Sequence, residues 1–184
     1  MRMRSLDSAA TMGNCFGAFP FTNAKRHACT PVIFGDNIVV ASHTFGVISF
    51  LVSKNGDDVT AKEAWRNKEM KINLATPVLV GGFLYSHGPS KNFACVDASN
   101  GQTKWTQAGF GEQVSHTVAY GDKLAVLTDA GELIVIKANP EKYHELARAQ
   151  VSGKSWVYPA AANGKLYIRD TKDLACYPIA ESTR

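Results

Sequence analysis

The sequence lacks an apolar run long enough to cross a membrane as a helix. Its two longest stretches without a charged residue, 37–53 and 72–90, are interrupted by polar residues, glycine or proline. A spanning helix needs about 20 predominantly apolar residues. The charged start, Met1 to Arg4, resembles the beginning of an export signal, but no continuous apolar stretch follows it. We therefore expect no transmembrane segment and no signal peptide.

Blocks of like charge and familiar catalytic motifs are also missing. The formal net charge is +4 and the basic residues are spread along the chain, so we expect no nucleic-acid partner. No G-x-S-x-G, P-loop, H-E-x-x-H or kinase motif occurs, and no catalytic residue is assigned. The five histidines are scattered, and the spacing of Cys15 and Cys29 near His27 matches no ordinary zinc pattern. We expect no metal site.

What the sequence does contain is one pattern repeated four times. An apolar strand, a two-residue turn and a second apolar strand recur around four anchor residues, Pro31, Pro77, Thr117 and Pro159. Their spacings of 46, 40 and 42 residues suit propeller blades of four strands. The residue types in the turns accept the positive φ of tight hairpins. The turn pairs are Gly35-Asp36, Gly81-Gly82, Gly121-Asp122 and Asn163-Gly164.

Further strands are predicted in each copy. Third strands are expected at 47–52, 93–97, 133–137 and 174–177. In copies one and two, a turn containing Gly56 or Gly101 leads to an outer strand ending in Trp65 or Trp105. In copy three the matching stretch, 143–151, has residues that favour helix, but the repeat predicts a strand. Copy four stops after its third strand.

These elements predict an all-β β-propeller with about four blades of four-stranded antiparallel sheet. The 184 residues divide into an irregular segment at 1–27, a partial propeller at 28–180 and a tail at 181–184. The blades are expected at about 28–66, 74–106, 115–151 and 157–179. Helical repeats share the period, but Asn-Gly turns and short β-branched runs are strand signals. A WD40 propeller is disfavoured because no tryptophan is followed by Asp.

The segment 93–105 resembles the blade motif of quinoproteins, in which Asp97 ends the third strand, Gly101 closes a turn and Trp105 packs between blades. The stretch from about Gly17 to Ile179 resembles the C-terminal half of PQQ-binding-like β-propeller repeat proteins. That superfamily includes the propeller lipoprotein of the outer-membrane β-barrel assembly machinery. The resemblance implies part of a seven- or eight-bladed ring and a periplasmic or cell-envelope location. It is specific for fold rather than for activity.

Two functions follow from this resemblance. The leading interpretation is a non-catalytic module that binds a protein or other ligand through its blade loops and central face, without a cofactor. A protein partner or a second copy would complete the ring. The alternative is a fragment of a PQQ-dependent dehydrogenase that oxidises alcohols or sugars with PQQ and Ca²⁺. Weak loop candidates for binding that cofactor are Asp129, Glu132, Asp170, Asp173, Lys91 and Lys172. A third hypothesis is a truncated product without independent function.

Aromatic and sulfur side chains complete the predicted core. Packing between blades is expected for the three tryptophans, Trp65, Trp105 and Trp156. Cys95 and Cys176 share a position in copies two and four, and two blades are too far apart for a disulfide. We expect both to be buried thiols. A pairing of Cys15 with Cys29 stays open.

Overall fold

The computed structural model describes residues 28–56 and 58–179, and this part of the chain folds into four antiparallel β-sheets. The predicted all-β propeller class is confirmed. Within these residues a short 3-10 turn, η1 (Pro89–Lys91), is the one helical element. None of the described residues forms a helix with the length and apolar character that crossing a membrane requires. The segments predicted at 1–27 and 181–184 lie outside the described residues.

Each sheet is one blade whose strands lie side by side in chain order. Blade one comprises β1 (Val32–Phe34), β2 (Asn37–Ser42), β3 (Gly46–Asn55) and β4 (Asp58–Asn67). Blade two comprises β5 (Val78–Val80), β6 (Phe83–His87), β7 (Asn92–Asp97) and β8 (Thr103–Ala108). Blade three comprises β9 (Ser115–Tyr120), β10 (Lys123–Thr128), β11 (Glu132–Lys137) and β12 (Glu145–Gln150). Blade four has only β13 (Ala160–Ala162), β14 (Lys165–Arg169) and β15 (Leu174–Pro178).

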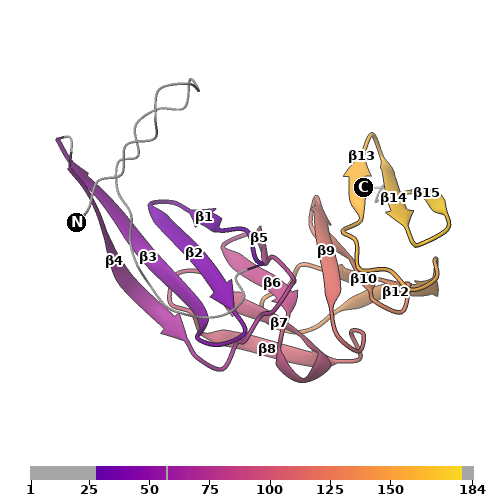
Figure 1. The fold of residues 1–184 in the computed structure, drawn as a ribbon, viewed down its shortest axis with the longest axis horizontal. Helices are drawn as coiled ribbons and strands as arrows, with labels where there is room; N and C mark the ends of the chain where they lie inside the picture. The colour runs from indigo at the N-terminus through magenta and orange to yellow at the C-terminus, as the bar shows by residue number, and fades with distance from the viewer. Residues whose placement is uncertain (1–27, 57, 180–184) are drawn as a thin grey trace.

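Figure 1 shows the four sheets following one another from the indigo end of the chain to the yellow end. The outer strand of blade three, β12, is a strand despite its helix-favouring residues, as the repeat predicts. Its pairing with β11 supplies backbone hydrogen bonds that local propensity does not anticipate.

One backbone hydrogen bond recurs in all four blades. An N–H near the end of the third strand donates to the carbonyl of the second residue in the hairpin turn, over 2.8 to 3.0 Å. The four donors are Val52, Ala98, Ala138 and Ile179. In blade four the turn residues Asn163 and Gly164 have φ of +50° and +68°, which is the geometry of a tight hairpin. The repeat in the sequence is therefore a repeat of backbone geometry.

A β-bulge also recurs, at the same place in the three complete blades. The pairing between strand three and the outer strand shifts after Ser49, Cys95 and Val135. The outer-strand residues opposite these positions are Trp65, Trp105 and Ala147, respectively. Because a bulge re-aims the side chain beside it, it sets the direction in which each tryptophan points.

Both outer-strand tryptophans lie between neighbouring blades. Trp65 Nε1 donates to the Ala98 carbonyl at 3.0 Å, and Trp105 Nε1 donates to the Asn139 carbonyl at 2.8 Å. The Trp65 ring covers Gly101, where an added Cβ would lie 2.3 Å from the ring. Only glycine leaves room for the indole at this turn.

The remaining motif residues shape the turns between strand three and the outer strand. Asp97 Oδ1 accepts the N–H of Ser99 at 2.9 Å and its hydroxyl at 2.6 Å, and these bonds lower the pKa of Asp97. The Gly101 N–H donates to the Asp97 carbonyl at 2.8 Å. Gly56 supplies a positive φ of +61° in the corresponding turn of blade one.

The hydrophobic core is divided among the interfaces between successive sheets. Between blades one and two it includes Val39, Val47, Leu84 and Val96. Between blades two and three it includes Tyr85, Phe93, Cys95, Leu124 and Ile134. Between blades three and four it includes Ala125, Leu127, Leu166 and Ile168. Since side chains alternate along a strand, each inner blade buries one face on the preceding blade and the other on the next.

Two predictions about buried side chains were wrong. Cys95 is buried, but Cys176 is exposed because no further blade among the described residues covers its face of blade four. Trp156 is 56% exposed. It precedes β13 instead of lying on an outer strand, so it has no bulge to aim it at a neighbouring turn. Cys29 is a free thiol, and Cys15 lies outside the described residues.

Replacing Trp105 by alanine tests the role of the packing between blades. Trp105→Ala removes both the ring and its bond to Asn139, and should lower the free energy of unfolding by about 3 kcal/mol. Trp156→Ala, the matched control, should change it by less than about 0.5 kcal/mol because its side chain is mainly in solvent. Urea unfolding followed by circular dichroism measures both. Equal losses would contradict the interface assignment.

Candidate functional site

The charged residues considered for a cofactor site lie at one end of the sheets, in or beside the loops between strands two and three. Asp129, after β10, accepts the Glu112 N–H on Oδ1 at 2.9 Å. Glu132 pairs with Arg148 at 2.6 Å. Lys91 forms a salt bridge with the Glu112 carboxylate. Asp129 and Lys91 are thus engaged by Glu112 of the connection before β9, and Glu132 by Arg148 on the outer strand β12.

The loop of blade four is organised by one carboxylate. Asp170 accepts backbone N–H groups of Gly153 at 2.7 Å, Lys172 at 2.7 Å and Asp173 at 2.8 Å. These backbone bonds, the one from Asp173 first, lower the pKa of Asp170 to about 2. Asp173 also accepts the Asp170 N–H through its carbonyl. Asp170 therefore holds the loop in shape.

The loop carboxylates are not arranged to bind PQQ with Ca²⁺. Calcium requires several oxygen ligands that converge on one point. The carboxylates of Asp129 and Asp170 face backbone N–H groups instead, and Glu132 faces an arginine. In the described ranges no three His, Cys, Asp or Glu residues are grouped as metal ligands.

A polar cluster lies where the first strands of the blades begin. Equivalent residues of the four copies meet there: Thr30, Thr76, His116 and Tyr158. The Tyr158 hydroxyl accepts the Thr76 N–H at 2.5 Å, and Thr76 Oγ1 accepts the Thr30 N–H at 3.0 Å. The His116 and Tyr158 rings are 4.0 Å apart. Blade four thus contacts blade two directly at the inner strands.

Two histidines at this cluster, its member His116 and the neighbouring His87, are buried. His116 and His87 are only 5% and 7% exposed. Burial lowers the pKa of both; for His87 the nearby Asp129 acts in the opposite direction. His87 Nε2 and His116 Nδ1 have no hydrogen-bond partner among the described residues. Folding therefore favours the neutral form of both rings.

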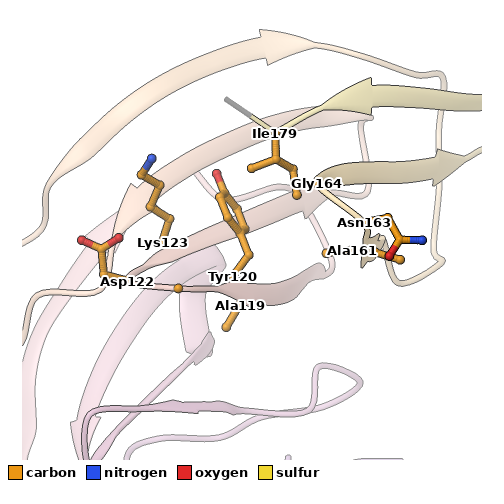
Figure 2. Close-up of a pocket in the computed structure, with 10 residues that line it drawn as sticks. Ala119, Tyr120, Asp122, Lys123, Ala161, Asn163, Gly164 and Ile179 are labelled. Carbon is orange, nitrogen blue, oxygen red and sulfur yellow. The ribbon is translucent and has the colours of Figure 1, made fainter. Parts of the chain in front are cut away.

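A groove separates the hairpin turns of blades three and four, as Figure 2 shows. Its volume is about 470 Å³, and its walls include Tyr120, Asp122, Lys123, Asn163 and Ile179. Tyr120 and Ile179 also join the core between these blades. Burial, and then the charge of Asp122, raises the pKa of the Tyr120 hydroxyl. The rim carries one charge of each sign, Asp122 and Lys123.

Exposed large apolar side chains lie on blades one and three and on or beside blade four, where they are Trp156, Tyr158 and Leu174. Leu174 on β15 is 74% exposed and pairs across the sheet with Arg169 on β14. Arg169 and Trp156 line one pocket of about 460 Å³. We call Trp156, Tyr167, Arg169, Leu174 and Cys176 the blade-four surface. Tryptophan, tyrosine and arginine are the residues that most often carry binding energy at protein interfaces.

The sequence predicts binding through the blade loops and central face, and it did not identify this exposed surface. It treated Trp156 and Cys176 as core residues. Their exposure depends on the neighbouring sheet: among the described residues no sheet packs on the face of blade four that is turned away from blade three.

The buried histidines predict loss of stability in mild acid. Their folded-state pKa values lie below the unfolded value of about 6.5, so the unfolded chain binds protons more readily. Their contribution to stability is present above that pH and is lost as the pH falls below it. Urea midpoints measured across this range should fall in the parent chain and fall less in a variant carrying His87→Gln and His116→Gln. Identical profiles would contradict the assignment.

Comparisons with known proteins agree with this architecture. A family model described as outer membrane protein assembly factor BamB matches residues 16–107, half of the chain. No curated protein sequence matches the chain.

Two similar solved structures show the fold. The crystal structure of BamB from Moraxella catarrhalis has a TM-score of 0.58 and 12% identity, over 82% of this chain and 43% of BamB. The computationally designed Ika8 protein has a TM-score of 0.63 and 11% identity, over 81% of this chain and 45% of Ika8. This chain therefore spans less than half the length of either structure. With its repeated blades, interblade tryptophans and matching family model, the chain belongs to the BamB-like family of PQQ-repeat β-propellers.

Proposed function

We propose that this chain is a non-catalytic propeller module that binds a protein partner in the cell envelope and takes part in outer-membrane protein assembly. The observation that carries this proposal is the blade-four surface, where Trp156 and Leu174 are mostly in solvent. The family assignment supports the cellular context, because the matching model describes an outer membrane protein assembly factor.

The chemistry of the surface favours a protein over a small molecule. Its exposed apolar groups lie on a sheet face and in the adjoining connection, flanked by Arg169. Protein interfaces combine apolar anchors with a polar rim in this way. The groove between blades three and four offers a second, more polar contact on the hairpin-turn side. The loop carboxylates, by contrast, are occupied in holding their own loops.

Capture from cells that naturally express the chain tests this proposal. A tagged chain is cross-linked in the cells, purified, and its partners are quantified by mass spectrometry. Outer-membrane assembly proteins should be enriched, and Leu174→Lys should reduce their recovery about tenfold, as expected for an interface anchor. Leu146→Lys is the matched control, since Leu146 is also exposed but lies on β12 of blade three. No enrichment, or equal loss in both variants, would contradict the proposal.

The absence of a cofactor is a separate expectation. Titration of the purified chain with PQQ and Ca²⁺ should leave the quinone absorbance unchanged, because the loop carboxylates already bind backbone N–H groups. Saturable binding, followed by dye reduction on addition of an alcohol or sugar, would favour the dehydrogenase alternative instead.

A further inference from the structure

Asn-Gly pairs are chemically reactive as well as suited to turns, and the sequence contains three of them: Asn55-Gly56, Asn100-Gly101 and Asn163-Gly164. The backbone nitrogen of the glycine can attack the asparagine side chain, because no Cβ hinders its approach. We propose that Asn163 is a site of spontaneous deamidation in the folded protein, whereas the fold protects Asn100. This inference goes beyond the proposed function and does not depend on it.

The reaction consumes only water. The Gly164 nitrogen forms a bond to Cγ of Asn163 and gives up its proton, the bond between Cγ and Nδ2 breaks, and ammonia leaves with that proton. Water then opens the cyclic imide at either of its two carbonyls. The product at position 163 is aspartate or isoaspartate, and either one carries a new negative charge.

The fold leaves the reacting groups of Asn163-Gly164 accessible. Both residues are exposed, and they are the central residues of the hairpin turn that the pairing of Ala162 with Lys165 closes. Among the described residues, the Asn163 side chain and the Gly164 N–H form no hydrogen bond. Neither the attacking nitrogen nor the amide under attack therefore has to give up a partner.

Exposure of this turn does not depend on which blades flank blade four. The equivalent turn of blade three, Gly121-Asp122, is also exposed, although blade three packs against a sheet on each of its faces. Gly81, in the turn of blade two, is exposed between blades one and three in the same way. The exposure is thus a property of the place of the turn within a blade.

Asn100-Gly101 lies in a closed environment between blades one and two. The Gly101 N–H, which would have to attack, donates to the Asp97 carbonyl at 2.8 Å. Asn100 Oδ1 accepts the Gln102 N–H at 2.9 Å. Gly101 is buried, and the Trp65 ring covers it. Attack on Asn100 therefore requires these bonds to break while the indole is displaced.

The two turns should consequently open at different rates. Separation of Ala162 from Lys165 exposes no core, because both residues already lie in solvent. Opening of the turn at Gly101 disturbs the packing of Trp65, whose Nε1 is bound to the Ala98 carbonyl. Local openings that break few buried contacts cost the least free energy. The folded protein should therefore deamidate at Asn163 first.

Deamidation would change the groove between blades three and four. Asn163 lines this groove together with Asp122 and Lys123 (Figure 2). Aspartate at this position would add a second negative charge to the walls. Isoaspartate would also lengthen the main chain of a two-residue turn by one atom. That change would disturb the bond from the Ile179 N–H to the Gly164 carbonyl, which is 2.8 Å long.

Timed peptide mapping tests the inference. The purified chain is incubated at mildly alkaline pH, either folded, as checked by circular dichroism, or unfolded in urea. Samples are digested in acid, and mass spectrometry measures aspartate and isoaspartate at positions 100 and 163. In the folded chain Asn163 should react at least about tenfold faster than Asn100, because its turn opens more easily. In urea the two rates should agree within about twofold, since glycine follows both residues.

Variants separate the two environments. Asn163→Gly copies the Gly81-Gly82 turn of blade two, and it should abolish the reaction at position 163 without changing the rate at Asn100. Trp65→Ala uncovers Gly101 and should raise the Asn100 rate about threefold or more in the folded chain. If that variant does not fold, Asn67→Ala takes its place, because it removes the bond from Asn67 Nδ2 to the Gly101 carbonyl.

Three results would overturn the inference. The first is an equal or faster reaction at Asn100 in the folded chain. The second is a reaction at both positions in urea with none at Asn163 in the folded chain, since the fold would then protect both. The third is an equally large difference between the two positions in urea, because the local sequence rather than the fold would then determine the rates.

Discussion

The structure depends on the packing of each sheet face against the next sheet. A single blade cannot bury its own apolar side chains, because both faces of a lone sheet meet water. Successive blades resolve this by sharing three cores, and the outer-strand bulge directs Trp65 and Trp105 into two of these interfaces. The indole N–H groups then bind backbone carbonyls of the next blade, which sets the relative position of the sheets.

Among the described residues, this packing buries only one face of blade four. Blade four buries Leu166 and Ile168 against blade three. On its other face Leu174 and Cys176 are exposed to solvent. The residue pattern that forms a core between the other blades leaves apolar side chains exposed on this face of blade four.

Several polar side chains stabilise the turns within blades and the contacts between blades. Asp97 and Asp170 bind backbone N–H groups in their turns, and both carboxylates consequently have lowered pKa values. His116 and Tyr158 meet where the inner strands converge, and the Tyr158 hydroxyl links blade four to blade two. In the loops considered for cofactor binding, the carboxylates of Asp129 and Asp170 thus stabilise the backbone conformation.

The sequence by itself determined the strands and the hairpin turns, because these depend on residues a few positions apart. It also determined the repeat, because its four copies recur every 40 to 46 residues. Residues 143–151 favour helix locally, but the repeat predicts a strand there, and the structure has the strand β12. Its pairing with β11 outweighs the local helical preference. Only the tertiary structure decided which equivalent residues are covered. Cys95 and Cys176 occupy the same place in their blades, yet one is buried and the other exposed. The difference lies in the neighbouring sheet, which no local pattern around either cysteine encodes.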